Sequence, residues 1–293
     1  MSGGLTVAVL GTGIMGYPMA ARLIDEGFDV RVWNRTKAKA QPLGEHGATV
    51  ADTPPEAVAG ANLVITMLAS AAVVRDVMNT PGGALAATSP KTLWVQMSTV
   101  GVKDTGELQE LADAAEVPFI DAPVLGTKQP AEQGQLVVLA SGPATAQDRC
   151  ERVFAPLASK VMWIGAAGEG TRLKLVANNW VLALTEASAE CVALARHLGL
   201  DPQLFLDAIE DTGVDSAYAH LKGKTMIQQE FPASFPARLA VKDASLVLDA
   251  AGSDVDLPTA RGVYRQMERT QELGHGDEDM AAAYHAVVHG KAQ

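Results

Sequence analysis

Short runs of β-branched and other apolar residues alternate with helical patterns along the first half of the chain. A helical pattern, Met15–Glu26, separates the first two of these runs. Strands that alternate with helices form βαβ units with right-handed crossovers, so a doubly wound, largely parallel sheet is expected. The predicted strands are Thr6–Leu10, Asp29–Trp33, Leu63–Leu68, Thr92–Met97, Phe119–Asp121, Leu136–Ala140 and Val161–Ile164.

The pattern changes after Gly170, where no convincing strand follows. A helical pattern of about 28 residues ends at Gly199, which is long for a globular helix. Asp201-Pro202 predicts the next helix start, as N-cap and first-turn proline. Further helices are predicted at Ala217–Gln228, Ala237–Ala251, Pro258–Leu273 and Met280–His289. The second half is therefore expected to be an all-α domain.

Composition limits the classes of protein. The chain has 293 residues, 48% of them hydrophobic and 19% charged, which suits two folded domains with large cores. Its net charge of -11 argues against a nucleic-acid partner. Two cysteines are too few for a disulfide framework and favour a cytoplasmic location. Neither a signal peptide nor a membrane-spanning run is expected, so no membrane partner is predicted.

A glycine-rich turn follows the first predicted strand and opens the first helix. It reads Gly11-Thr12-Gly13-Ile14-Met15-Gly16, the spacing of the Rossmann dinucleotide fingerprint in its required context. The alternative is a glycine turn that binds nothing. We expect an α/β fold with a Rossmann-type domain at residues 1–165, followed by an all-helical substrate and oligomerisation domain at residues 166–293.

The end of the second strand indicates which dinucleotide binds. An acidic residue there would accept hydrogen bonds from the ribose hydroxyls of NAD, but the sequence is Asn34-Arg35-Thr36-Lys37. The Arg35 guanidinium can pair with a 2′-phosphate, and Asn34 and Thr36 can donate hydrogen bonds to it. NADP(H) is therefore the predicted cofactor. The alternative is that Arg35 and Lys37 form only a solvated helix start.

Lys174 and Asn178 lie one helical turn apart in the long helical pattern, within Gly168–Asn179. Side chains at this spacing share one face of a helix. A lysine in an apolar helix is costly unless it has a partner or a function. Lys174 is therefore a candidate catalytic acid, and a surface lysine is the alternative.

Three other segments gather polar residues. Gln96–Val100 follows a strand at the sheet edge where ligands bind, Asp121–Gly134 contains several glycines, and Phe235–Asp243 begins a later helix. By themselves, a Lys-Asp pair is usually solvated and a phenylalanine is usually part of the core.

Together these motifs resemble the β-hydroxyacid dehydrogenase family, which is 3-hydroxyisobutyrate dehydrogenase-like. The resemblance covers nearly the whole chain through Gly11–Gly16, Asp121–Gly134, Gly168–Asn179 and Lys242-Asp243, in that order. The run Gly126–Leu136 looks most like the glyoxylate/succinic semialdehyde reductase branch.

The resemblance implies a role for each matching residue. Lys174 would be the general acid, and Asn178 would orient a small carbonyl substrate. The substrate and nicotinamide pocket would also include Thr99, Phe235 and Asp243, with Lys242, Met67, Leu68 and Val73 beside the cofactor.

Leu125 departs from the family pattern, because the family commonly has a serine there that binds the substrate carboxylate. Leucine cannot donate a hydrogen bond, although the backbone N–H groups of Gly126 and Thr127 can hold an anion. This departure favours a larger or more apolar carbonyl compound over a glyoxylate-sized acid.

Two alternatives remain open at this point. An imine reductase would share the cofactor domain; Leu125 favours it and Lys174 opposes it. A cofactor-binding scaffold without catalysis is the second alternative, and Lys174 and Asn178 oppose it.

No metal site is predicted, since His285 and His289 lack an evident third ligand. The apolar long helix predicts a homodimer or homotetramer.

Overall fold

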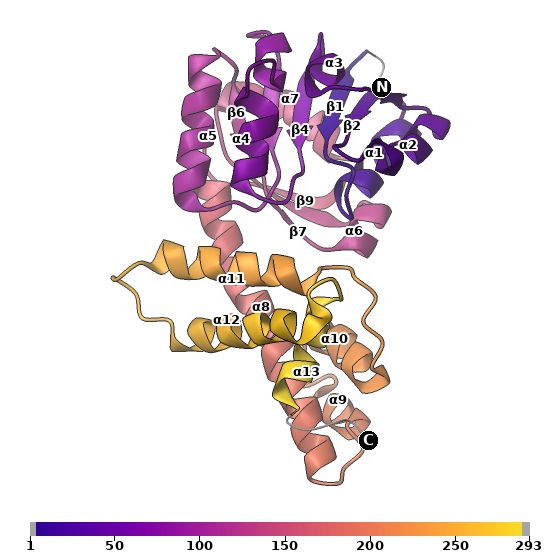
Figure 1. Ribbon diagram of the computed structural model, residues 1–293, viewed down its shortest axis with the longest axis vertical. Helices are drawn as coiled ribbons and strands as arrows, with labels where there is room; N and C mark the ends of the chain where they lie inside the picture. Colours follow the sequence, from indigo (N-terminus) through magenta and orange to yellow (C-terminus); the bar gives the residue numbers. More distant parts are fainter. Residues whose placement is uncertain (1–3, 289–293) are drawn as a thin grey trace. The chain divides into compact units, whose positions relative to one another are not determined.

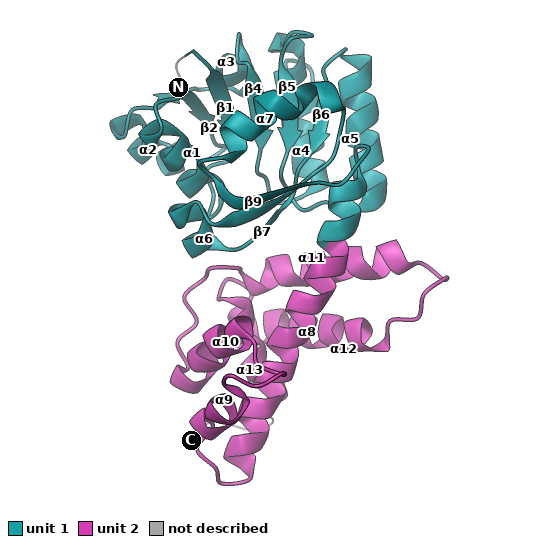
Figure 2. Ribbon diagram, turned by 180° about the vertical axis from the view of Figure 1, so that it is seen from behind, with its two compact units in different colours: residues 1–174 teal, residues 175–293 magenta. Residues whose placement is uncertain are grey.

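The structure is a computed structural model that describes residues 4–288. The chain divides into two compact units, residues 1–174 and residues 175–293 (Figure 2). The predicted domain boundary at 165/166 precedes this division. We describe each unit in turn.

The first unit contains a six-stranded parallel sheet with the strand order β3-β2-β1-β4-β5-β6 (Figure 1). The order in which successive strands are added to the sheet reverses between β1 and β4, which is where doubly wound sheets open their ligand crevice. The expected Rossmann topology is therefore confirmed. The strands are β1 (Thr6–Leu10), β2 (Asp29–Trp33), β3 (Thr49–Val50), β4 (Leu63–Thr66), β5 (Leu93–Gln96) and β6 (Phe119–Asp121).

Helices cover both faces of this sheet. Successive strand residues point to opposite sides, so each strand contributes side chains to both buried layers. Val7 and Val9 join one buried cluster with α1 (Gly16–Asp25), α2 (Gln41–Glu45) and α7 (Gln147–Phe154). Ala8 and Leu10 join the other cluster. That second layer contains α3 (Pro54–Val58), α4 (Ala71–Asn79) and α5 (Val102–Ala114).

A second, three-stranded sheet differs from the sequence expectation. It consists of β7 (Val124–Leu125), β8 (Leu136–Ala140) and β9 (Ala158–Trp163), with β7 antiparallel to β8 and α6 (Lys128–Gln133) between them. The strands expected at Leu136–Ala140 and Val161–Ile164 therefore belong to a separate sheet. The two-residue strands β3 and β7 are too short to show a period in the sequence.

The long helix α8 (Glu169–His197) passes from the first unit into the second and confirms the predicted helix. No glycine or proline interrupts it after Gly170. It is followed by Gly199, whose φ of 75° lies in the left-handed region that commonly ends helices.

The second unit is all-helical within the described residues, as predicted. Its helices pack around two buried clusters that include Leu182 and Met267 in one and Val192 and Met226 in the other. The helices are α9 (Gln203–Ile209), α10 (Ala217–Gln228), α11 (Ala237–Ala251), α12 (Pro258–Thr270) and α13 (Tyr284–Val287). Two shorter turns, η4 (Gln271–His275) and η5 (Met280–Ala283), follow α12.

Two predicted helix ends are wrong. The helix expected to run to Leu273 ends at Thr270. The wider, π-helical turn η4 follows it directly. The helix expected at Met280–His289 divides into η5 and α13, and its last residue lies outside the described residues. Both departures fall where the chain tightens or widens its turn, which a 3.6-residue pattern cannot predict.

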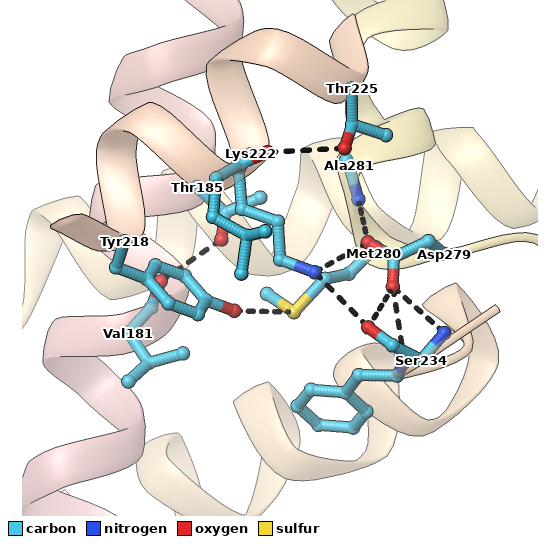
Figure 3. A network of polar contacts seen from close by, with 11 residues as sticks. Val181, Thr185, Tyr218, Lys222, Thr225, Ser234, Asp279, Met280 and Ala281 are labelled. Atoms are coloured by element: carbon cyan, nitrogen blue, oxygen red, sulfur yellow. Dashed lines mark hydrogen bonds and ion pairs between the residues drawn. The ribbon is translucent and has the colours of Figure 1, made fainter. Parts of the chain in front are cut away.

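A buried ion pair in the second unit links α10 to the residue that precedes η5 (Figure 3). Lys222 Nζ lies 2.6 Å from Asp279 Oδ1, and both side chains are almost fully buried. The other oxygen of Asp279 accepts hydrogen bonds from the Ser234 hydroxyl at 2.7 Å and the Phe235 backbone N–H at 3.1 Å. The carboxylate therefore fixes the segment that leads into α11.

Among the described residues, none of the helices has the length and hydrophobicity that crossing a membrane requires.

Candidate functional site

The three glycines of the first loop have distinct environments. A Cβ atom on Gly11 would overlap the carbonyl oxygen of Met67, and one on Gly16 would overlap the carbonyl oxygen of Gly11. A Cβ atom on Gly13 would meet no atom within 4 Å. Gly11 and Gly16 are thus required for packing, and Gly13 leaves open space where the backbone can approach a pyrophosphate.

The rest of this loop surrounds that open space. Thr12 is buried and its backbone N–H donates to Asn34 Oδ1 at 3.1 Å, which links the loop to the end of β2. Ile14 is partly exposed, and Met15 precedes α1, whose free N–H groups favour an anion. The loop therefore suits a phosphate ligand.

The end of β2 presents one uncommitted cation. Asn34 Nδ2 donates to the carbonyl oxygen of Thr36 at 2.9 Å, and Lys37 pairs with Asp52 at the end of β3. Arg35 is exposed and has no hydrogen bond or ion pair among residues 4–288. Its guanidinium is therefore available to a phosphate, whereas the Lys37 ammonium group is already paired with a carboxylate.

Residues after β4 and β5 continue the same edge of the sheet. Met67 and Leu68 follow β4, and the Leu68 backbone N–H donates to Ser98 Oγ at 2.9 Å. Val73 lies in the first turn of α4, and Thr99 is half-buried after β5. The structure thus brings the predicted cofactor residues of the first unit to one edge, the carboxyl ends of the strands.

The start of α8 is fixed against the sheets by a buried carboxylate. Asp121 accepts hydrogen bonds from the Thr171 backbone N–H at 2.7 Å and the Thr171 hydroxyl at 2.8 Å. Ser141 Oγ accepts from the Gly170 N–H at 2.9 Å. A Cβ atom on Gly170 would overlap the carbonyl oxygen of Leu139, so this position tolerates only glycine.

Burial raises the pKa of Asp121 to about 6, against the lowering effect of the hydrogen bonds from Thr171 and Ser141. From the sequence, Asp121 is the last residue of a predicted strand and the first of the predicted substrate loop, with no role of its own. A carboxylate ending the buried strand Phe119–Asp121 was the available signal, because buried charges need partners.

Lys174 follows this anchor by one turn and is buried, with 8% of its surface exposed. Its Nζ donates a hydrogen bond to the Val124 carbonyl oxygen at 2.7 Å. Val124 directly precedes the predicted substrate residues Leu125, Gly126 and Thr127. The structure therefore brings Lys174 to the start of the predicted substrate loop, and a surface location for this lysine is excluded.

The loop after Val124 turns at Gly126, whose φ of 117° favours glycine. Leu125 is half-buried in β7, and Thr127 begins α6 in an extended conformation without capping it. Gly126 is therefore needed for the turn itself.

In the second unit, Asn178 and Asp243 form a buried pair. Asn178 Nδ2 donates to Asp243 Oδ2 at 2.7 Å, and Lys242 Nζ pairs with Asp243 Oδ1 at 2.8 Å. The carboxylate acceptor orients the Asn178 amide. Phe235 is half-buried against the cluster that contains Leu182, held by its N–H bond to Asp279. The fold thus gathers Asn178, Asp243 and Lys242.

The open glycine loop and the buried lysine define a dinucleotide-binding protein with groups suited to proton transfer. Residues 6–165 match the family described as the NAD binding domain of 6-phosphogluconate dehydrogenase. Residues 168–287 match the family described as NAD-binding of NADP-dependent 3-hydroxyisobutyrate dehydrogenase.

Individual relatives agree with both matches. The chain is 32% identical to glyoxylate/succinic semialdehyde reductase 2, chloroplastic, of Arabidopsis thaliana, over 99% of this chain and 82% of the relative. It is also 32% identical to glyoxylate/succinic semialdehyde reductase 1 of the same plant, over 97% and 98%. The Mycobacterium tuberculosis 3-hydroxyisobutyrate dehydrogenase structure with L-serine has a TM-score of 0.85 at 31% identity, over 97% and 99% of the two chains.

The chain belongs to the β-hydroxyacid dehydrogenase family, the family that includes 3-hydroxyisobutyrate dehydrogenase. It is an NAD(P)-dependent oxidoreductase acting on CH–OH groups, as the sequence predicted. An imine reductase from Myxococcus stipitatus in complex with NADP+ shares the fold, with a TM-score of 0.68 at 20% identity over 97% and 100% of the two chains.

Proposed function

We propose that the chain is an NADPH-dependent reductase, reversible as a dehydrogenase, of a small semialdehyde or β-hydroxyacid-type substrate. The observation that carries this proposal is the buried Lys174 Nζ, 2.7 Å from the Val124 carbonyl oxygen at the start of the substrate loop. Relatives named as semialdehyde reductases support the substrate class.

In this mechanism, NADP(H) would supply the hydride for reduction and accept it in the reverse direction. The residues that would hold it are the Gly11–Gly16 loop, Arg35 with its neighbours, and Lys242. Reduction of a carbonyl group places negative charge on its oxygen. Lys174 stabilises that charge and donates its Nζ proton to the oxygen, and it recovers the proton in the reverse direction.

Asn178 orients the substrate through the part of its amide that is not bound to Asp243. Thr99 of the first unit and Phe235 of the second are the other proposed substrate residues. Asp243 holds the amide in place, because its carboxylate accepts from Asn178 and pairs with Lys242.

Lys174→Ala should reduce turnover by several orders of magnitude, because no other group is proposed to supply the proton. Binding of NADPH, measured by titration of its fluorescence, should persist. Lys160→Ala, which removes an exposed lysine from β9, is the matched control and should retain turnover. Near-normal turnover in Lys174→Ala would refute the assigned role.

NADP(H) is the proposed cofactor because Arg35 is uncommitted and Lys37 is paired with Asp52. Arg35→Ala should weaken NADPH binding at least about tenfold and leave NADH binding nearly unchanged, since only NADPH carries the 2′-phosphate. Lys37→Ala is the control, with a smaller expected effect. Equal losses for the two cofactors in Arg35→Ala would contradict the assignment.

Leu125 favours imine reduction as the second candidate function, because it removes a side-chain donor for a carboxylate. A screen of NADPH oxidation decides between them. It uses glyoxylate, succinic semialdehyde, tartronate semialdehyde, methylmalonate semialdehyde and a cyclic imine. Oxidation with a semialdehyde supports the first proposal, and oxidation with the imine alone supports the second. No oxidation with any of these compounds would favour a scaffold that only binds the cofactor.

The proposal includes a cytoplasmic, homo-oligomeric enzyme. Cys150 and Cys191 are both free thiols, which fits a reducing compartment. Exposed apolar residues on α8 support association with a second copy.

A further inference from the structure

We propose that His275, Glu278 and His285 form a binding site for a divalent transition-metal ion of the zinc class. Each residue offers one ligand atom, and these three atoms lie within 4.8 Å of one another. All three residues belong to the second unit and none is a proposed cofactor or substrate residue. The proposal therefore does not depend on the reductase activity.

The fold creates this cluster by interrupting a helix. Beyond α12 the chain widens into η4, where Gly274 has a φ of 95° and His275 ends the turn. The Glu278 backbone N–H donates to the His275 carbonyl oxygen at 3.2 Å, which folds the acid back toward the imidazole. His285 returns to the same place from α13.

Distances within the cluster suit a shared ion. His275 Nδ1 lies 3.0 Å from Glu278 Oε1. Two ligands of a tetrahedral zinc ion lie ~3.3 Å apart when each bond is about 2.0–2.1 Å. The His275 and His285 rings are stacked, with centroids 4.0 Å apart and planes 12° apart. The His285 ring also makes an edge-to-face contact with Phe231, with the ring centroids 4.9 Å apart. This contact keeps His285 beside His275.

The polar atoms of the cluster are incompletely satisfied. His275 Nδ1 and Glu278 Oε2 are both buried and have no hydrogen-bond partner among the described residues. The 3.0 Å approach of Nδ1 to Oε1 is thus a close contact without hydrogen-bond geometry. Buried polar atoms of this kind cost free energy unless a ligand satisfies them. A cation between the two side chains would satisfy both.

The ligand types select the ion. Two imidazoles and one carboxylate suit zinc and similar transition metals, whereas magnesium and calcium prefer oxygen ligands. Three protein ligands leave a fourth position for water. Parallel rings direct their lone pairs side by side, so binding should open the stack until both imidazoles face the ion. The bound ion would then fasten η4 to α13.

The test uses the full chain, stripped of metal with a chelator and titrated with zinc chloride by calorimetry. The ligand variants are His275→Ala, Glu278→Gln and His285→Phe, the last of which retains an aromatic ring against Phe231. The matched control is His220→Ala, which removes a histidine paired with one carboxylate, Asp215, at 2.9 Å. Each protein is also melted with and without zinc, because an ion that binds only the folded chain raises Tm.

The wild-type chain should bind one equivalent of zinc and gain stability from it. Each ligand variant should lose affinity roughly tenfold or more and lose the zinc-dependent rise in Tm. His220→Ala should behave as wild type. The proposal is overturned if the wild-type chain binds no zinc, if His275→Ala combined with His285→Phe binds as well as wild type, or if His220→Ala loses as much affinity. Circular dichroism of the metal-free variants verifies that each is folded.

Discussion

At the scale of single residues, Glu186 is a carboxyl group that the proposed mechanism does not use. It lies in the middle of α8, is 5% exposed, and has no hydrogen-bond partner for either oxygen among residues 4–288. Burial raises its pKa to about 8, and the charge of Glu190 adds to this effect. The side chain is therefore protonated at neutral pH.

This raised pKa makes stability depend on pH. The folded chain retains the Glu186 proton up to about pH 8, whereas the unfolded chain releases it near the usual glutamate pKa of 4.5. The contribution to stability is thus complete below the unfolded pKa and is lost as pH rises toward the folded pKa. At about 1.4 kcal/mol per pKa unit, the free energy of unfolding falls by roughly a few kcal/mol over this pH range.

Glu186→Gln should flatten that dependence and raise the free energy of unfolding at about pH 8, because glutamine never ionises. Urea unfolding at several values between about pH 5 and pH 8 measures the effect. Glu190→Gln, at an exposed position, should reduce the slope only slightly. Parallel pH profiles for wild type and Glu186→Gln would show that Glu186 ionises normally.

The sequence predicted some of the residue arrangements around the candidate site and not others. Lys174 and Asn178 could be predicted because helix periodicity fixes their spacing. The pairing of Asn178 with Asp243 needed a resemblance, since 65 residues separate them. The His275, Glu278 and His285 cluster could not be predicted, because a π-helical turn and a left-handed glycine bring its members together.

At the scale of elements, the start of α8 determines where Lys174 lies. The anchor consists of Asp121, Ser141 and the two N–H groups of Gly170 and Thr171. A carboxylate at a helix N-terminus also interacts favourably with the helix dipole. The position of the proposed acid thus depends on a residue that has no proposed part in the chemistry.

Asp121→Asn should destabilise the chain by about 1–3 kcal/mol, because an amide offers one acceptor oxygen where the carboxylate uses two. Turnover should fall while NADPH binding persists. Thermal melting and single-turnover kinetics measure the two effects. Asp148→Asn removes an exposed carboxylate from the first turn of α7 and should change neither. Wild-type turnover in Asp121→Asn would contradict the positioning role.

Element bounds were predictable where the period persists. The bounds of α10 and α11 match the sequence expectation: Ser216 caps the start of α10, and α11 combines an apolar stripe with Gly252 at its end. The pairing of β8 with β7 and β9 in a separate sheet was not predictable. A buried strand has the same apolar composition in either sheet, and only its tertiary partners differ.

At the scale of the whole molecule, one face of α8 carries apolar side chains that the chain itself leaves exposed. Val176, Trp180 and Leu194 are each more than half exposed, as is Leu198 just after the helix. Trp180, Ala187 and Leu194 follow one another at intervals of seven residues, the repeat of paired helices. This stripe supports the proposed homo-oligomer.

Light scattering at micromolar concentration should give the mass of a dimer or tetramer. Trp180→Glu should lower that mass, because it places a charge in the proposed interface. Lys103→Glu, at an exposed position of α5 and away from this stripe, should not. A monomeric mass for the wild-type chain would refute the oligomer.

The carboxylate anchor at the start of α8 also bears on where the chain can be divided. A fragment that stops at residue 165 strips Asp121 of both hydrogen bonds from Thr171 and Ser141 of its donor Gly170. A fragment that stops at residue 174 retains all three. The first turns of α8 thus complete the hydrogen bonds of Asp121 and Ser141. We expect a soluble nucleotide-binding fragment to require these turns, although they follow the last strand.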